Sequence, residues 1–165
     1  MKIRPACPRE LDGIMKIYAD ARAFMKENGN PEQWGDHYPP RELICEDIAR
    51  GCCRVCECDG EIVGVFYYAE GEDPTYRVIE GGAWLNDRPY GVIHRIATDR
   101  QRRGVASFCF AWALDRCKNL KIDTHRDNLP MQRSLAKNGF TRCGIVHLAD
   151  GDERIAYQKS QENVI

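Results

Sequence analysis

The segment from residue 91 to residue 119 constrains the fold more than any other part of the sequence. Gly91 to Thr98 is rich in β-branched residues and predicts a strand. Val105 to about Asn119 predicts a largely apolar helix. A short basic turn joins the two, and its last residue is Gly104. A strand that leads directly into a helix is typical of folds that layer helices on a sheet.

The turn itself, Gln101-Arg102-Arg103-Gly104-Val105-Ala106, has the chemistry of a phosphate site. The amides at the start of a helix have no carbonyl partner within it, and the positive end of the helix dipole attracts anions. Gly104 has no Cβ, so the backbone can come close to a phosphate. Taken alone, the same six residues also fit a solvated basic turn.

A second pattern follows at Asp123-Thr124-His125-Arg126-Asp127-Asn128, directly after a short predicted strand. Pro130 to Lys137 then predicts a helix that Asn138-Gly139-Phe140 closes. The two patterns, in this order and at this spacing, resemble the GCN5-related N-acetyltransferase (GNAT) family of acyl-coenzyme A-dependent transferases. The resemblance covers residues 90–147 well and the rest of the chain loosely.

Length and charge agree with a single soluble globular domain. The 165 residues suit a single domain over 1–165, and the net charge of −1 gives no reason to expect nucleic acid or an anionic membrane as partner. Met1-Lys2-Ile3-Arg4-Pro5 lacks the apolar core of a signal peptide, and no apolar run is as long as a bilayer is thick. We therefore expect a cytoplasmic protein, and a homodimer stays open.

The nine cysteines do not form a metal-binding pattern. Cys53 and Cys56 make one C-x-x-C pair, but no second pair follows, and a structural zinc site normally needs two paired ligand sets. The alternation from Cys52 to Cys58 suits a strand, in which a buried cysteine acts as a small hydrophobe. We expect reduced thiols and no metal.

The remaining elements complete a β-α-α-β-β-β-α-β-α-β-β order, which predicts a mixed, mostly antiparallel sheet of six to seven strands with helices on both faces. This α/β (α+β) arrangement is also what the family resemblance implies. Tyr76 to Glu80 is a further candidate for a short strand. The predicted strands are Met1 to Ala6, Cys53 to Cys58, Ile62 to Ala69, Gly91 to Thr98, Lys121 to His125, Thr141 to Leu148 and Arg154 to Lys159. The predicted helices are Pro8 to about Glu27, Arg41 to Arg50, Val105 to Asn119 and Pro130 to Lys137.

The resemblance implies acetyl-coenzyme A as acyl donor and assigns residues to hold it. The amides of Arg102 to Ala106 would face the pyrophosphate, together with Gln101 and the hydroxyl of Ser107. The family pairs the strand before this turn with the pantetheine arm, which corresponds here to Ile96, Ala97 and Thr98. Asn128 matches a cofactor-facing asparagine, and it is equally an N-cap for the following helix.

Transfer to an amine also requires a base, because an alkyl ammonium is almost fully protonated at pH 7. His94 is our first candidate, since it lies on the predicted cofactor strand and its ordinary pKa is near working pH. A hydrogen-bonded sheet histidine is the alternative explanation. Glu80 and His125 are the runners-up for this role.

The sequence departs from the family at Leu135, where many members have a tyrosine that protonates the leaving sulfur. Tyr157 or Tyr90 could take that role, although each also suits a packed aromatic. A thiolate is a tolerable leaving group, so the departure does not exclude catalysis. It is the main argument for an alternative function, an acyl-coenzyme A sensor without turnover.

Aromatic residues on two loops are candidates to line the acceptor pocket. An aromatic wall with one or two carboxylates suits a cationic amine, either a small molecule or a peptide terminus. The candidates are Trp34, Asp36 and His37 on the first loop, Trp84, Asp87 and Tyr90 before the cofactor strand, and His125. All of them also suit surface-loop anchors.

Overall fold

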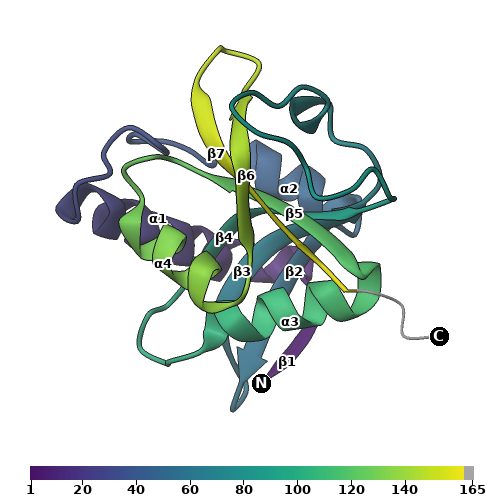
Figure 1. The fold of residues 1–165 in the computed structure, drawn as a ribbon. Helices are drawn as coiled ribbons and strands as arrows, with labels where there is room; N and C mark the ends of the chain where they lie inside the picture. Colours follow the sequence, from purple (N-terminus) through teal and green to yellow (C-terminus); the bar gives the residue numbers. More distant parts are fainter. Residues whose placement is uncertain (162–165) are drawn as a thin grey trace. The chain divides into compact units, whose positions relative to one another are not determined.

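The computed structural model describes residues 1–161, drawn as a ribbon in Figure 1. It divides into two compact units. The first unit comprises residues 1–68 and 94–109, and the second comprises residues 69–93 and the chain from 110 onward. The boundaries fall inside the strands β3 (Glu61–Glu70) and β4 (Gly91–Thr98) and inside the helix α3 (Val105–Cys117), so each of these elements contributes to both units. The single domain expected from the sequence stays a prediction.

The first unit contains a β-hairpin flanked by helices. Its Asp59-Gly60 turn has φ values of 53° and 80°, as a two-residue type I′ turn requires. Strands β1 and β2 pair antiparallel, as do β2 and β3. The elements are β1 (Lys2–Pro5), the short helix η1 (Pro8–Glu10), α1 (Leu11–Glu27), α2 (Arg41–Ala49), β2 (Cys53–Cys58) and β3 (Glu61–Glu70).

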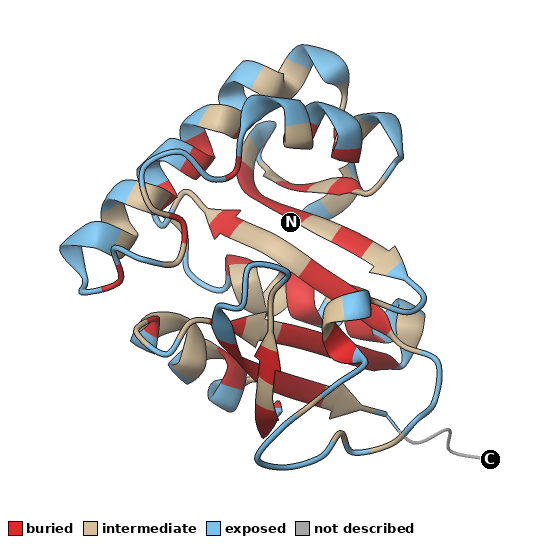
Figure 2. Cartoon of the chain, turned by 90° about the horizontal axis from the view of Figure 1, so that it is seen from above, coloured by how far each residue is buried: buried red, intermediate tan, exposed pale blue. Residues whose placement is uncertain are grey.

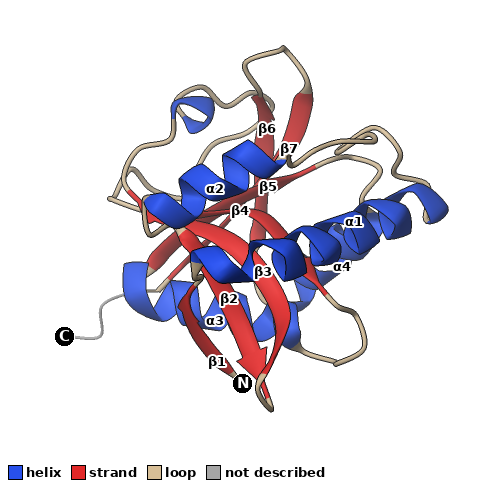
Figure 3. Cartoon of the chain, turned by 180° about the vertical axis from the view of Figure 1, so that it is seen from behind, coloured by secondary structure: helices blue, strands red, loops and turns tan. Residues whose placement is uncertain are grey.

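The two faces of this hairpin pack against different helices, because successive residues of a strand point to opposite sides. Val55 and Val65 belong to a core with buried residues of α1 and α2, and Figure 3 shows α1 crossing β2 and β3. Figure 2 shows the outer sides of these helices exposed and their inner sides buried. The neighbouring Gly64 lies against Val105 at the start of α3 (Val105–Cys117).

The second unit is built on an antiparallel strand trio. Strands β5 (Asn119–Thr124) and β6 (Thr141–His147) both pair antiparallel with β7 (Glu153–Ser160). The first residues of β4 pair with β5 in parallel, at Gly91↔Leu120 and Val92↔Lys121. The strand order β1-β2-β3-β4-β5-β7-β6 confirms the predicted mixed, mostly antiparallel sheet.

Helix α4 (Leu129–Lys137) begins and ends as its sequence indicates. At its start, Asn128 Oδ1 accepts a hydrogen bond from Met131 N at 3.2 Å, which confirms the N-cap. At its end, Gly139 has φ 79°, and the amide of Phe140 bonds to the carbonyl of Leu135. This is a Schellman ending, and Phe140 packs on Phe110 of α3 behind it.

The prediction of a strand from Tyr76 to Glu80 was wrong. Pro74–Tyr76 instead form a short 3₁₀ helix, because Asp73 Oδ1 accepts from Thr75 N and Pro74 occupies the first helical position. Only Glu80 makes strand-like contacts, through two backbone bonds with Ile145. The β-branched Val78 and Ile79 suggested a strand from local preference alone.

Within residues 1–161, no helix combines the length and the apolar character that a membrane span requires.

Candidate acyl-donor and acceptor sites

The turn before α3 has the backbone geometry that the phosphate hypothesis needs. Gly104 has φ 80°, and a Cβ placed there would meet no atom within 4 Å. The first helical hydrogen bond at this end runs from Phe108 N to the Gly104 carbonyl. The amides of Val105 and Ala106 precede that bond and therefore have no carbonyl within the helix to pair with.

The two arginines of the turn differ in their surroundings. Arg102 donates to Asp59 Oδ2 at 2.8 Å and to Glu61 Oε2 at 3.3 Å, so its guanidinium is held by the β2–β3 hairpin. Arg103 is exposed, like Gln101. If Arg102 contributes to a phosphate site in this conformation, it does so through its amide rather than its side chain.

Strand β4 carries the three residues assigned to the pantetheine arm, and the backbone changes direction just before them. Arg95 has φ 52° in the middle of the strand, a left-handed conformation that residues with a Cβ rarely adopt. Ile96, Ala97 and Thr98 follow in extended conformation, and the amide of Asp99 bonds to the Val63 carbonyl of β3.

His94 lies beside an aromatic ring in the first unit. Its imidazole stacks on Tyr67, with ring centroids 5.7 Å apart and an interplanar angle of 29°. The guanidinium of Arg95 lies over the same ring, 4.7 Å from its centroid. In a regular strand two successive side chains would point to opposite faces, so the left-handed residue places both on one side.

Trp34 is a core residue of the first unit. It is buried and packs edge-on against Tyr18, with ring centroids 5.8 Å apart. Its other neighbour is Tyr38, at 6.1 Å. This packing is the structural alternative to the acceptor role expected for Trp34, and the neighbouring Asp36 and His37 are exposed.

Trp84 and Tyr90 come together in the second unit, but around a cation that belongs to the protein. The ammonium of Lys121 lies 4.1 Å from the Trp84 ring centroid and 3.9 Å from that of Tyr90. Burial lowers the pKa of Lys121, and the residue is only 4% exposed. The aromatic faces expected to receive a cationic amine thus already hold a lysine.

The loop that carries these rings is tied to the strands below it. Tyr76 donates its hydroxyl hydrogen to Asp123 Oδ2 at 2.6 Å, and Trp84 Nε1 donates to the Tyr76 carbonyl. The Leu85 amide donates to Gln158 Oε1 at 2.8 Å. Asp87 is exposed on the same loop.

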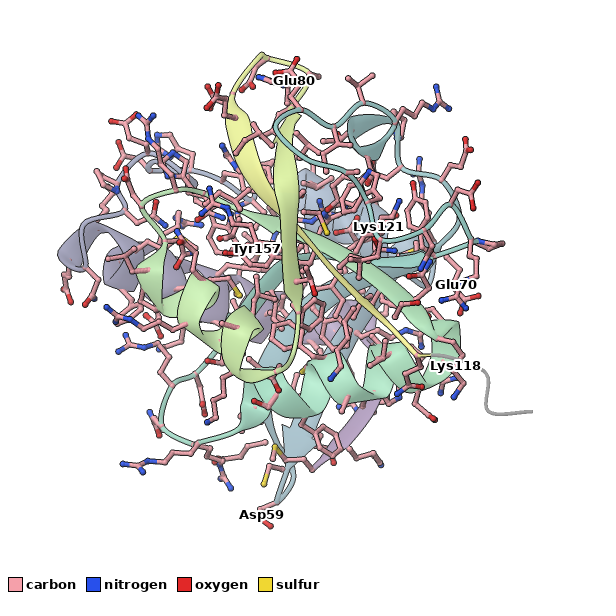
Figure 4. The ribbon with its side chains drawn as sticks, in the orientation of Figure 1. Asp59, Glu70, Glu80, Lys118, Lys121 and Tyr157 are labelled. Carbon is pink, nitrogen blue, oxygen red and sulfur yellow. The ribbon has the colours of Figure 1, made fainter. Side chains whose placement is uncertain are left out.

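Glu80 and Tyr157 do not come together in the second unit. Glu80 is exposed, and Figure 4 shows it near the β6–β7 turn, away from Tyr157 on β7. Tyr157 is buried, and this burial raises the pKa of its hydroxyl.

His125 and Asn128 lie in the turn between β5 and α4. The Asp127 amide donates to Nδ1 of His125 at 3.0 Å, so this nitrogen is an acceptor and the ring is neutral. Burial, together with the charges of Arg154 and Arg126, lowers the pKa of His125. Asn128 is buried, and its backbone N–H donates to the His125 carbonyl.

All nine cysteines have free thiols, and in residues 1–161 no three His, Cys, Asp or Glu side chains gather in a group that could hold a metal ion. Cys56 and Cys109 are both fully buried and hydrogen-bond to each other between β2 and α3.

Sequence reasoning missed Asp47, Tyr18 and Gly64, which shape the surroundings of β4. The sequence pattern could have indicated Asp47, because it lies three residues after Ile44 and therefore on the same, buried face of α2. A carboxylate on such a face needs a buried partner.

These elements define an acyltransferase fold in which an open turn at Gly104 precedes α3. Residues 13–140 match the acetyltransferase (GNAT) family, and the chain belongs to this family of acetyltransferases. The family resemblance drawn from the two motifs is thereby confirmed.

Solved structures agree with this assignment. A GNAT acetyltransferase from Streptococcus agalactiae 2603 is 36% identical with a TM-score of 0.90, over 98% of this chain and 96% of that one. A putative acetyltransferase from Staphylococcus aureus Mu50 is 26% identical with a TM-score of 0.71, over 97% of this chain and 99% of that one. A ribosomal-protein-alanine N-acetyltransferase from Brucella melitensis, at 19% identity and a TM-score of 0.63 over 98% and 100%, shares the fold. No curated protein matches the sequence significantly.

Proposed function

We propose that this protein transfers an acetyl group from the thioester of acetyl-coenzyme A directly to a primary amine, on a small molecule or a peptide terminus. The observation that carries the proposal is the turn before α3. There Gly104 leaves open space in front of amides that have no partner within the helix.

The donor would be held by main-chain groups of the first unit. The amides of residues 102–106 would bind the pyrophosphate, with Gln101 at the edge and the Ser107 hydroxyl as an additional donor. Ile96 to Thr98 would pair with the pantetheine arm, and an amide near Ala97 would stabilise charge on the thioester oxygen. Asn128 stays a candidate from the sequence for a further contact with the donor.

His94 would remove the proton from the amine, directly or through a water. Tyr157 is the candidate to protonate the departing thiolate, since Leu135 stands where many family members have a tyrosine. Glu80 is the alternative candidate for the general base. Trp34, Trp84, Tyr90 and His125 stay the candidates for acceptor contacts.

Replacement of Gly104 tests the donor site. A valine there would put a branched side chain into the space where the phosphates are expected, so acetyl-coenzyme A affinity should fall by at least tenfold in titration calorimetry. Gly151→Val is the matched control, because Gly151 also has a positive φ of 92° and open space around its Cβ position. Equal, undiminished affinity in both variants would contradict the placement of the phosphates.

Replacement of His94 tests the base. In His94→Ala we expect turnover to fall at least tenfold while acetyl-coenzyme A affinity changes little, because the imidazole acts on the acceptor. Thiol release with a panel of amines is the readout. Unchanged turnover would exclude His94, and tight donor binding without release from any amine by the unmodified protein would favour the sensor.

A further inference from the structure

Arg95 is the only non-glycine residue inside a strand between residues 1 and 161 whose φ is positive, at 52°. For residues with a Cβ this conformation is disfavoured and persists only where the surroundings impose it. Specific contacts must therefore hold Arg95 in place.

The side chain of Arg95 is fixed by a buried ion pair. Its Nη2 and Nε both donate to Asp47 Oδ2 on α2, at 2.8 and 3.1 Å. The two side chains are only 11% and 7% exposed. The guanidinium also donates to the Tyr38 hydroxyl at 3.3 Å and lies over the Tyr67 ring.

The main chain of Arg95 is fixed separately. The Tyr18 hydroxyl on α1 donates to the Arg95 carbonyl at 2.8 Å. Tyr18 is 1% exposed and packs against Trp34. Because Tyr18 lies on a helix that covers one face of the sheet, this bond turns the Arg95 carbonyl toward that face and away from the neighbouring strand.

These contacts have little value for stability alone. Burial raises the pKa of Asp47, whereas the contacts with Tyr38 and Asp47 raise the pKa of Arg95. The cost of taking both charges out of water therefore offsets much of their attraction. A buried pair of this kind is better explained by the conformation that it imposes.

We propose that Asp47 and Tyr18 are positioning residues that clamp Arg95 in its left-handed conformation and so aim the catalytic part of β4. The residues immediately after the clamp are Ile96 to Thr98, and the residue immediately before it is His94. The clamp therefore sets the direction of the amides that meet the acyl donor and keeps His94 on the Tyr67 side. This inference rests on the proposed function.

Two double variants separate the conformation of residue 95 from the charges around it. Asp47→Asn/Arg95→Gly and Asp47→Asn/Arg95→Ala both lack the ion pair and leave no unpaired buried charge. They differ by one methyl group, and only glycine adopts a positive φ without strain.

We expect the glycine variant to bind acetyl-coenzyme A within about threefold of the unmodified protein. The alanine variant should bind about tenfold more weakly than the glycine variant, which corresponds to ~1.4 kcal/mol. KM for acetyl-coenzyme A should rise in the alanine variant while KM for the amine stays constant, a split that general loosening would not produce. All measurements are made well below the unfolding temperature of each variant.

Equal affinity in the two double variants overturns the clamp, whether both bind tightly or both bind weakly. Tyr18→Phe is the independent check, since it removes the bond to the Arg95 carbonyl and keeps the ring, and it should raise KM for acetyl-coenzyme A several-fold. No heat of binding from the unmodified protein would instead overturn the proposed function, and the clamp's role with it.

Discussion

At the scale of single residues, Lys121 is the group whose surroundings differ most from what the sequence suggested. Trp84 and Tyr90 were expected to face a cationic substrate, yet both rings lie against this lysine. Local pattern could not show this, because Lys121 lies 31 residues or more from both rings along the chain. A role of the two rings in binding the acceptor stays a prediction, and the structure adds a protein cation that contacts both.

Lys121→Met should therefore raise the unfolding temperature at pH 7, by about 2–4 °C. Burial disfavours the charged form, so the unfolded chain binds the proton more strongly, and this cost is complete below the lowered pKa of the folded state. The gain should shrink as the pH rises from that pKa towards 10.5, the ordinary lysine value. Thermal unfolding monitored by circular dichroism between pH 7 and 10.5 measures it.

Lys118→Met is the control, because Lys118 is exposed and forms an ion pair with Asp115 at the surface (Figure 4). Its unfolding temperature should change by about 1 °C or less. A Lys121 variant that is less stable than the unmodified protein would show that the cation–π contacts outweigh the cost of burial. A gain that does not depend on pH would show that it does not come from the buried charge.

At the scale of elements, bounds were predicted well and local backbone exceptions were not. Gly91 to Thr98 was predicted with the bounds that the structure has, because β-branched residues and flanking turns mark it. The left-handed Arg95 within it left no trace in the sequence, since the contacts that impose it come from Asp47 and Tyr18, 48 and 77 residues away. Long-range contacts of this kind decide the candidate site.

Gly64 illustrates how one element positions another. A Cβ on Gly64 would lie 2.8 Å from Val105 Cγ1 and 3.5 Å from the Ala97 carbonyl. Gly64→Ala should therefore push the start of α3 outward, lower the stability by ~1–3 kcal/mol and weaken acetyl-coenzyme A binding several-fold. Urea unfolding and calorimetry measure the two effects.

Gly13→Ala adds the same methyl group as Gly64→Ala, but we expect it to raise the stability of the protein. Gly13 lies in α1, and a Cβ there would meet no atom within 4 Å. The added methyl should stabilise the protein by ~0.4–1 kcal/mol and leave donor binding unchanged. If Gly64→Ala is equally harmless, α3 is not seated on that strand as tightly as the structure indicates.

At the scale of the whole molecule, the thiols report on the folding of both units. Four of the nine cysteines are buried: Cys53, Cys56 and Cys109 in the first unit and Cys143 in the second. Burial raises the pKa of Cys53 to about 12, so its reactive thiolate is scarce at neutral pH. The abundance of cysteine is thus explained in part by core packing, as the sequence indicated for the alternating residues from Cys52 to Cys58.

Native protein treated with a thiol reagent at pH 7.5 should label the exposed Cys45 first, then the partly exposed cysteines, and leave the four buried thiols unmodified until denaturant is added. Mass spectrometry of the labelled peptides gives the order. Labelling of Cys53 or Cys143 as fast as Cys45 would show that the unit concerned opens readily in the native state.

The ion pairs between the β2–β3 hairpin and Arg102 have a practical consequence for protein engineering. Because Asp59 and Glu61 hold this arginine, inserting a tag, a fluorophore or new chain ends at that hairpin would transmit a disturbance to the phosphate turn. The exposed turn at Asp150-Gly151 is closed by hydrogen bonds within residues 148–152, which makes it the better place for such an insertion.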